Sequence, residues 1–255
     1  MHDLFDLTGK LALVTGSSRG LGRSLALALA EAGARVVLHG RDAAALDAAR
    51  ASITEATGAE PSAVTFDVTD AGAVEAAVAD IIAEHGVPDI LVNNAGLQRR
   101  APFTEFDVAD WDAIVSSNLS SAFYVSRFVT PGMAERGSGK VINIGSVQSQ
   151  LARQTIAPYS ATKGGIVMLT KGMAADLARF NVQVNAISPG YFATEMNRAL
   201  VEDEAFSSWL IARTPAQRWG DFRELWGTLM YLASDASSFV SGQNIFVDGG
   251  MTAVV

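Results

Sequence analysis

Three polar residues in the second half of the chain have the types and the spacing of a proton-transfer site. Ser146 follows the apolar run 141–145, and Tyr159 and Lys163 stand four residues apart, so in a helix they share one face. A tyrosine phenol has a pKa of about 10, and a nearby ammonium group favours the phenolate and lowers that pKa. We therefore expect Ser146 to polarise a carbonyl oxygen while Tyr159 delivers the proton.

A glycine-rich turn near the N-terminus provides a second chemical signal. It runs Thr15-Gly16-Ser17-Ser18-Arg19-Gly20-Leu21-Gly22, between a predicted strand and a predicted helix. Gly16 can adopt positive φ, while Gly20 and Gly22 let the backbone approach a ligand and the sheet closely. The helix start offers free N–H groups and a positive dipole end to a pyrophosphate. In this context the turn predicts a dinucleotide site, although a lone glycine triplet is also found in ordinary strand–helix connections.

The end of the second predicted strand bears on which dinucleotide binds. NAD enzymes usually place an acid there, about 20 residues after the glycine turn, to hold the ribose 2′-hydroxyl. Here the strand runs into Gly40-Arg41, and the Arg41 guanidinium suits a 2′-phosphate that Arg19 can flank. We therefore predict a preference for NADP(H), with NAD(H) possible. Two alternatives stay open: Arg41 is a solvated loop residue, and Asp42 either caps the next helix or reaches the ribose.

Strand-length apolar runs alternate with helical patterns along the whole chain. Continuous Val, Ile and Leu runs, each followed by a helix, indicate a parallel sheet covered on both faces. We predict a single α/β domain over residues 1–255, a doubly wound, Rossmann-type, seven-stranded parallel sheet that binds ligands at the carboxyl ends of its strands. The predicted strands are 11–15, 35–39, 63–66, 90–93, 140–145, 183–188 and 244–247, and the predicted helices are 22–32, 43–57, 71–84, 111–135, 159–179 and 221–234.

Residues 191–218 interrupt this alternation. The segment is too long for an ordinary connection, and long connections within a compact domain usually serve function. We predict a substrate lid with short helices there.

Composition excludes several classes of function. The 255 residues are 49% hydrophobic and 18% charged, as in a well-buried globular protein, and cysteine is absent. The net charge of −8 argues against a nucleic-acid partner, and an anionic ligand would need basic residues concentrated locally. The histidines, at positions 2, 39 and 85, are too scattered to predict a metal site. Without a basic, apolar leader or an apolar run of about 18 residues, we expect a cytoplasmic protein with no membrane segment.

Taken together, these motifs resemble the short-chain dehydrogenase/reductase family over essentially the whole chain. The resemblance rests on the glycine turn, Asn93-Asn94-Ala95-Gly96, Asn118, Ser146, Tyr159-x-x-x-Lys163, and Pro189-Gly190 with Thr194. It implies that Tyr159 is the general acid/base, that Lys163 holds the nicotinamide ribose, that Ser146 orients substrate and that Asn118 supports a water in a proton relay. The C-terminal Asp248-Gly249-Gly250 resembles the family segment that often takes part in tetramer contacts, which implies a homotetramer.

The cofactor site expected from the turn and the resemblance extends along the strand ends. Asp67, after the third predicted strand, can accept from the adenine amino group, its alternative role being a helix-entry cap. The expected cofactor contacts are Gly16, Ser18, Arg19, Gly20, Leu21, Gly22, Arg41, Asp67, Val68, Asn94, Ala95, Gly96, Tyr159, Lys163, Pro189, Gly190 and Thr194.

The variable segments give a narrower resemblance, to the gluconate 5-dehydrogenases of this family, also called 5-ketogluconate reductases. It is carried by residues 91–106, 149–153, 155–159, 201–206 and 213–220. The resemblance implies interconversion of 5-keto-D-gluconate and D-gluconate, and a keto-sugar acid carboxylate suits an arginine clamp. We expect Arg100, Arg99, Gln148 and Arg153 to bind the substrate. The alternatives are a surface salt bridge for any one arginine, and another keto-sugar acid, a polyol or a 3-oxoacyl thioester as substrate.

Overall fold

The computed structural model describes residues 2–193 and 198–254. Its strands form one sheet in the order β3-β2-β1-β4-β5-β6-β7, and every neighbouring pair is parallel. The predicted seven-stranded parallel sheet is therefore confirmed, and each predicted strand boundary lies within one residue of the observed one. The strands are β1 (Leu11–Val14), β2 (Arg35–Gly40), β3 (Ser62–Thr65), β4 (Ile90–Asn93), β5 (Gly139–Ile144), β6 (Val182–Pro189) and β7 (Asn244–Val247).

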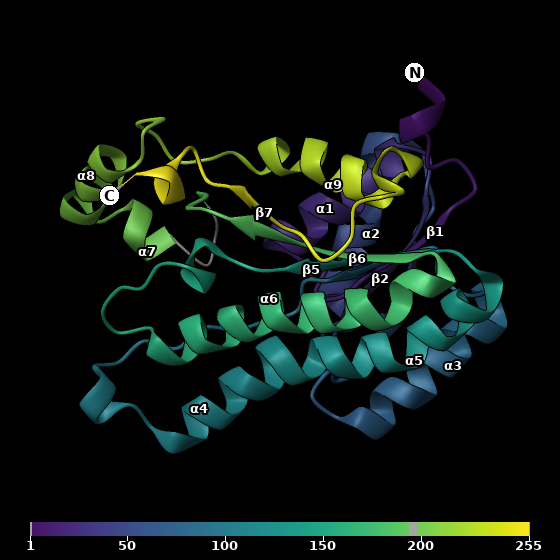
Figure 1. The fold of residues 1–255 in the computed structure, drawn as a ribbon, viewed down its shortest axis with the longest axis horizontal. Helices are drawn as coiled ribbons and strands as arrows, with labels where there is room; N and C mark the ends of the chain where they lie inside the picture. The colour runs from purple at the N-terminus through teal and green to yellow at the C-terminus, as the bar shows by residue number, and fades with distance from the viewer. Residues whose placement is uncertain (1, 194–197, 255) are drawn as a thin grey trace.

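Helices cover both faces of this sheet, as Figure 1 shows: α1, α2 and α9 lie on one side, and α3, α5 and α6 on the other. The side chains of β1 explain the two-sided burial. Val14 packs into a core cluster with α1, α2 and α9, whereas Leu13 packs into a second cluster with α3 and α5. The helices are α1 (Gly20–Glu31), α2 (Ala43–Thr57), α3 (Ala71–His85), α4 (Val108–Val115), α5 (Ser121–Arg136), α6 (Ala157–Leu177), α7 (Arg198–Val201), α8 (Glu204–Arg213) and α9 (Trp226–Ala233).

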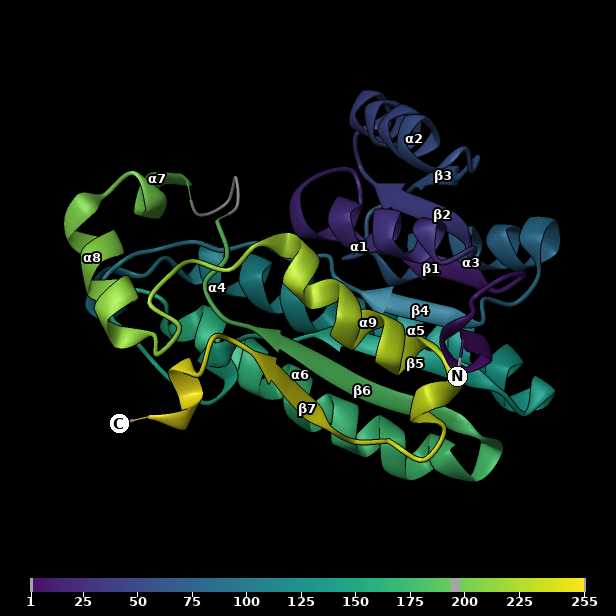
Figure 2. The same ribbon diagram turned by 90° about the horizontal axis from the view of Figure 1, so that it is seen from above.

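The strand order reverses at β1, which pairs with β2 on one side and with β4 on the other. In open α/β sheets, ligands bind in the crevice that this reversal leaves at the carboxyl ends of the strands. The two short helices α7 and α8, within the segment 191–218, lie beyond that same end of the sheet (Figure 2). The carboxyl ends of the strands and the segment 191–218 therefore lie at the same end of the sheet.

The long helix predicted over 111–135 differs from the structure. It is observed as α4 and α5 joined by a turn of π-helix, Ser116–Ser120, and the whole runs from Val108 to Arg136. Asp107 begins it by accepting a hydrogen bond from the Ala109 N–H. Single π-turns inside helices are found mostly at functional sites, and this one contains Asn118.

The helix predicted over 221–234 also differs, because its first turn is a 3-10 turn, Phe222–Leu225, that precedes α9. Asp221 and Glu224 form a capping box at this turn, which fixes where the chain re-enters helical geometry. No helix in residues 2–193 and 198–254 is long and apolar enough to cross a membrane.

Candidate active site

Ser146 and Tyr159 line one pocket at the carboxyl end of β5. Ser146 lies two residues after the end of β5 and caps the 3-10 turn Val147–Ser149, where its Oγ accepts from the Gln148 N–H at 3.1 Å. The Ser146 N–H donates in turn to Ser188 Oγ on β6 at 3.1 Å. Tyr159 stands in the first turn of α6, where Pro158 occupies a position that needs no N–H donor. Both residues therefore line the pocket, one from the end of β5 and the other from the start of α6.

Lys163 lies one turn further along α6 and is buried. Its Nζ donates to the Ile144 carbonyl at 2.7 Å and lies 5.6 Å from the centre of the Tyr159 ring. Burial lowers the pKa of Lys163 to about 8. The i, i+4 spacing thus places the ammonium beside the phenol, as expected, but anchors it to the backbone of β5.

The pKa of the Tyr159 phenol corrects the expectation that Lys163 lowers it. Burial raises this pKa above its ordinary value. The hydrogen bond of Ser146 and the charge of Arg100 act in the opposite direction, and the nearby Tyr191 raises the pKa further. Desolvation of a phenolate outweighs the two lowering contributions, so the proton stays on Tyr159 at neutral pH.

Asn118 is buried in the π-turn and holds the loop that follows β4. Its Oδ1 accepts from the Leu97 N–H at 2.7 Å, and its Nδ2 donates to the Leu97 carbonyl at 2.9 Å and to Thr162 Oγ1 at 3.3 Å. A single amide side chain thus satisfies both backbone groups of Leu97 and reaches α6 next to Lys163. Asn118 therefore ties three elements together at the site.

The glycine turn has the shape required to bind a dinucleotide pyrophosphate. A Cβ on Gly22 would lie 2.2 Å from the Gly16 carbonyl oxygen, so only glycine lets α1 approach the turn. Gly20 has a φ of +55°, and a Cβ added to it would meet nothing within 4 Å, so this residue faces open space. The N-terminus of α1 has neither a side-chain cap nor an acidic residue in its first turn, which leaves its N–H groups for an anion.

The loop after β4 packs directly on this turn. The Asn94 Nδ2 donates to the carbonyls of Thr15 and Gly16, both at 3.0 Å, while Thr15 Oγ1 accepts from the N–H groups of Asn94 and Ala95. Asn93 instead points into the core, where its Nδ2 donates to Ser126 Oγ and Asn143 Oδ1. The structure therefore separates Asn93 from its neighbours and gives it an internal role.

Of the residues expected at the adenosine end of the cofactor, some form internal hydrogen bonds and others are exposed. Asp42 caps α2 by accepting from the Ala45 N–H at 3.1 Å, whereas Arg19 and Arg41 are exposed and form no ion pair within the described residues. Asp67 is not a helix cap: its Oδ1 accepts from the N–H and hydroxyl of Thr69, and these bonds lower its pKa. Val68 beside it is buried.

Gly190 directly follows β6 and lines the same pocket as Tyr159. A Cβ on Gly190 would lie 2.7 Å from the Asp248 Cα, so the C-terminal segment packs against bare backbone there. Pro189 is the last residue of β6 and pairs with Val247. Thr194, expected to contact the cofactor, lies outside the described residues.

The pocket in front of Tyr159 is rich in basic and amide groups. Burial and the charge of Arg153, which lines the same pocket, both lower the pKa of Arg100. Within the described residues, the Nε of Arg153 and the Oε1 of Gln148 are buried without a hydrogen-bond partner. The residues that line the pocket are Gln98, Arg100, Ser146, Val147, Gln148, Arg153, Ile156, Tyr159, Gly190, Tyr191 and Leu200.

Arg99, the other arginine of this loop, is separated from that group. Its Nε lies 3.5 Å from Asp110 Oδ1 on α4, both side chains are largely exposed, and Arg99 is absent from the pocket lining. The structure therefore brings Arg100, Arg153 and Gln148 to Tyr159 and leaves Arg99 in a surface ion pair.

Tyr191 is the first residue of the predicted lid, but no individual role at the site is predicted for it from the sequence. Its hydroxyl accepts from the Gln148 Nε2 at 3.3 Å, and its ring packs against Phe206 and Trp219, each with a centroid separation of 5.9 Å. The Arg153 guanidinium lies over Phe206, 5.5 Å from the ring centre. An aromatic cluster from α8 and its flanking loops thus covers the basic pocket.

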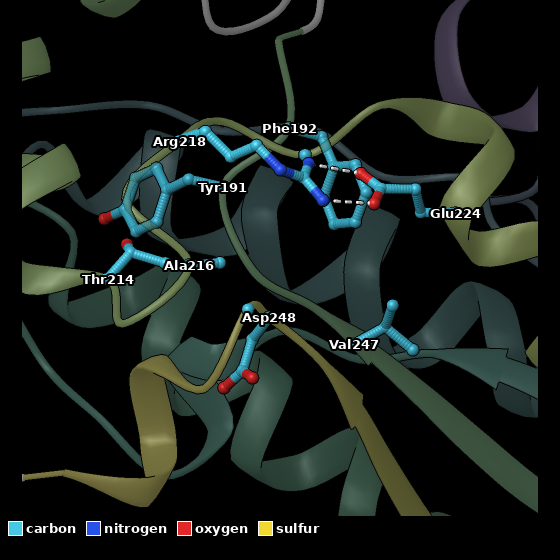
Figure 3. Close-up of a pocket in the computed structure, with 10 residues that line it drawn as sticks. Tyr191, Phe192, Thr214, Ala216, Arg218, Glu224, Val247 and Asp248 are labelled. Atoms are coloured by element: carbon cyan, nitrogen blue, oxygen red, sulfur yellow. Dashed lines mark hydrogen bonds and ion pairs between the residues drawn. The ribbon is translucent and has the colours of Figure 1, made fainter.

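A second pocket, shown in Figure 3, lies between residues 214–220 and the segment after β7. Its one arginine, Arg218, forms two hydrogen bonds to the Glu224 carboxylate, at 2.8 and 2.6 Å, which lower the pKa of Glu224 to about 2. Asp248 accepts from the N–H groups of Gly250 and Thr252. Because these charged groups already have partners, their contacts stabilise the loop, and the pocket is a poor candidate for an active site.

Comparisons with known proteins agree with this geometry. A family model described as enoyl-(acyl carrier protein) reductase matches residues 16–252. Gluconate 5-dehydrogenase of Gluconobacter oxydans is 55% identical over 98% of this chain and 97% of its own length, and 5-keto-D-gluconate 5-reductase of Escherichia coli K12 is 50% identical over the full length of both. The crystal structure of a gluconate 5-dehydrogenase from Burkholderia cenocepacia in complex with NADP and tartrate is 52% identical, covers 100% of this chain and 99% of that one, and superposes with a TM-score of 0.96. With the family model matching nearly the whole chain and such relatives aligned end to end, this protein is a member of the short-chain dehydrogenase/reductase family.

Proposed function

We propose that this protein interconverts 5-keto-D-gluconate and D-gluconate by hydride transfer with NADP(H). The observation that carries the proposal is the pair Arg100 and Arg153, which faces Tyr159 in one pocket and has no carboxylate partner within the described residues. Two guanidinium groups in one pocket of an acidic protein favour an anionic ligand, and a sugar-acid carboxylate supplies one. The tartrate in the Burkholderia relative is likewise a hydroxy acid with carboxylates.

The protein's own residues perform the proton chemistry. The nicotinamide, when bound, supplies or accepts the hydride at carbon 5. Ser146 donates a hydrogen bond to the carbonyl oxygen, and Tyr159, whose pKa is raised by burial, delivers its proton to that oxygen during reduction. Lys163 is anchored to the Ile144 carbonyl and Asn118 to Leu97, and we propose that Lys163 holds the nicotinamide ribose and that Asn118 supports a water in the proton relay.

Gln148 completes the proposed substrate site. Its buried Oε1 lacks a partner within the described residues, so it can accept from a sugar hydroxyl while the arginines hold the carboxylate. We propose that residues 191–218, with α7 and α8, form the lid of this pocket. The aromatic cluster over Arg153 supports that role.

The cofactor residues favour NADPH. Asp42 is engaged as a helix cap and Arg41 is unpaired within the described residues, so the 2′ position meets a cation instead of an acid. Arg19 at the start of α1 can contact the same phosphate. We propose that the turn at 16–22, Asp67 with Val68, and the loops at 94–96 and 189–190 bind the remaining dinucleotide.

Steady-state reduction of 5-ketogluconate with NADPH and with NADH in parallel tests substrate and cofactor together. Arg100→Ala should raise the KM for 5-ketogluconate, and Arg99→Ala, in a surface ion pair, serves as the matched control. Tyr159→Phe should lower kcat by about 10²- to 10⁴-fold, the usual contribution of a general acid. An unchanged KM in Arg100→Ala, or a preference for an uncharged ketone or a 3-oxoacyl thioester over the sugar acid, would refute the substrate assignment.

We further propose a cytoplasmic homotetramer. Apolar side chains on α4, α5 and α6, which lie on the same side of the sheet, support association. The exposed fractions are 43% for Trp111, 50% for Phe123 and 63% for Met168. Light scattering on the purified protein tests the oligomeric state, and cell fractionation tests the location.

A further inference from the structure

The ring of His39 is a buried titratable group that the proposed chemistry does not use. It is the next-to-last residue of β2 and is 2% exposed. The Gly16 N–H donates to its Nδ1 at 3.0 Å, and its Nε2 lies 3.1 Å from the Phe66 carbonyl oxygen. Each ring nitrogen therefore contacts the backbone of a different segment, one before α1 and one after β3.

These two contacts fix the protonation state of the ring. Because the Gly16 N–H is a donor, Nδ1 must carry a lone pair, and the single proton must then sit on Nε2 and donate to Phe66. Burial lowers the pKa of His39 to about 4, while the charged groups that act on it, Asp67 and Arg41, have opposing effects. Both geometry and burial thus hold the imidazole neutral.

The backbone of His39 adds two further bonds to the same turn. The His39 N–H donates to Ser17 Oγ at 2.9 Å, and its carbonyl accepts from the Ser17 N–H at 2.8 Å. The His39 ring also lies against the Phe66 ring, with centroids 4.0 Å apart. One residue therefore fastens the glycine turn to β2 by three hydrogen bonds and to the end of β3 by a fourth.

We propose that His39 is a positioning residue of the dinucleotide site, which sets the glycine turn, Arg41 and Asp67 at fixed separations. Gly16 begins the proposed pyrophosphate turn, Arg41 follows His39 by two residues, and Asp67 directly follows Phe66. The inference rests on the proposed cofactor site, but it does not depend on which sugar acid is the substrate.

The test measures nucleotide binding without any sugar acid. NADPH and NADH are titrated by fluorescence against the wild type, His39→Leu, His39→Asn and His39→Gln, with His85→Asn as the histidine control and Arg41→Ala as the reference for the 2′-phosphate. Loss of the Gly16 bond leaves a part-buried N–H without its partner, so His39→Leu should raise both dissociation constants by a similar factor, on the order of tenfold. Arg41→Ala should raise the dissociation constant of NADPH alone.

The conservative variants separate positioning from simple packing. An asparagine in place of His39 keeps an acceptor near the place of Nδ1, whereas a glutamine puts its amide near the place of Nε2. His39→Asn should therefore bind both nucleotides more tightly than His39→Gln. This comparison holds even if His39→Leu fails to fold. Histidine-selective ¹⁵N NMR of the wild type should show one neutral ring with its proton on Nε2.

Three results would overturn the proposal: unchanged affinities in a folded His39→Leu variant, equal affinities of the His39→Asn and His39→Gln variants, or a protonated His39 ring at pH 7. A wild type that binds NADPH but does not reduce 5-ketogluconate would refute only the proposed substrate. The two failures are thereby distinguishable.

Discussion

The phenol of Tyr159 is surrounded by groups with opposing effects on its proton. Burial raises its pKa, whereas Ser146 and Arg100 lower it, and the net result lies above the ordinary value. A neutral phenol is the form needed to protonate a carbonyl oxygen, so reduction can proceed at neutral pH without a titration of Tyr159. The reverse reaction needs a phenolate and must gain rate as pH rises towards this raised pKa.

Replacing Arg100 should shift the pH at which the rate of the reverse reaction rises. Because the Arg100 charge lowers the pKa of Tyr159, Arg100→Ala should raise this pKa and shift the rise of kcat for gluconate oxidation to higher pH. The kcat is measured at saturating gluconate and NADP⁺ across the alkaline range, with Arg99→Ala as control. A shift to lower pH, or the same shift in Arg99→Ala, contradicts this account.

At the residue scale, the sequence allowed the reacting groups to be predicted but not their electrostatics. The spacing of Tyr159 and Lys163 predicts a shared helix face, which the structure confirms. It does not reveal that the Lys163 ammonium is directed to the Ile144 carbonyl, because that contact requires the packing of α6 on β5. The role of Arg99 was likewise decided by Asp110, which lies on a helix whose orientation no local pattern specifies.

At the scale of elements, the π-turn in the α4–α5 helix is the feature that sequence periodicity missed. An apolar pattern with a period near 3.6 residues continues through a single wide turn, so 111–135 was predicted as one helix. The turn contains Asn118, whose side chain takes both backbone groups of Leu97 as partners. Long-range hydrogen bonds of this kind leave no signature in the helix's own sequence.

Asn118→Ala should therefore destabilise the loop after β4 as well as the helix. It leaves the part-buried N–H and carbonyl of Leu97 without their partner, at a cost of roughly 1–3 kcal/mol. A thermal midpoint lower by several degrees, together with reduced kcat, is expected from unfolding scans and steady-state assays. Gln243→Ala, which removes an exposed amide bond to the Ser241 carbonyl, is the control. Wild-type stability and activity in Asn118→Ala would exclude this role.

The helix α8 offers a second test at this scale. Phe206 faces the aromatic cluster and Arg153, whereas Trp209, its neighbour on α8, is 50% exposed. Phe206→Ala should raise the KM for 5-ketogluconate by roughly two- to thirtyfold, the range of one cation–π contact, and leave the KM for NADPH unchanged. Trp209→Ala should have a smaller effect. Equal effects of the two variants would argue against the proposed lid.

At the scale of the whole molecule, the sheet explains how residues from distant positions meet. Seven parallel strands direct their carboxyl ends to one edge of the sheet, so Gly16, which follows β1, and Gly190, which follows β6, lie at the same edge. Alternating apolar runs were enough to predict this architecture, since strand burial on both faces is visible in the sequence. The sequence could not place α7 and α8 over the pocket, because their contacts are made by side chains such as Tyr191 and Trp219 from separate loops.

The stability of the whole fold should depend on His39 in a pH range separate from that of the carboxylates. The folded pKa of His39 is about 4, against an ordinary value of 6.5, so the unfolded chain binds a proton more readily between these values. The stability that the neutral ring contributes is present above pH 6.5 and falls with pH towards 4, by up to about 3 kcal/mol. Glu224, with its pKa lowered to about 2 from 4.5, loses its contribution only below this range.

His39→Asn removes the titrating ring, and its free energy of unfolding can be measured by urea titrations at about pH 4.5 to 7. This free energy should fall less steeply with acid than that of the wild type or of His85→Asn. Parallel slopes for His39→Asn and the wild type would show that the buried imidazole does not control acid stability.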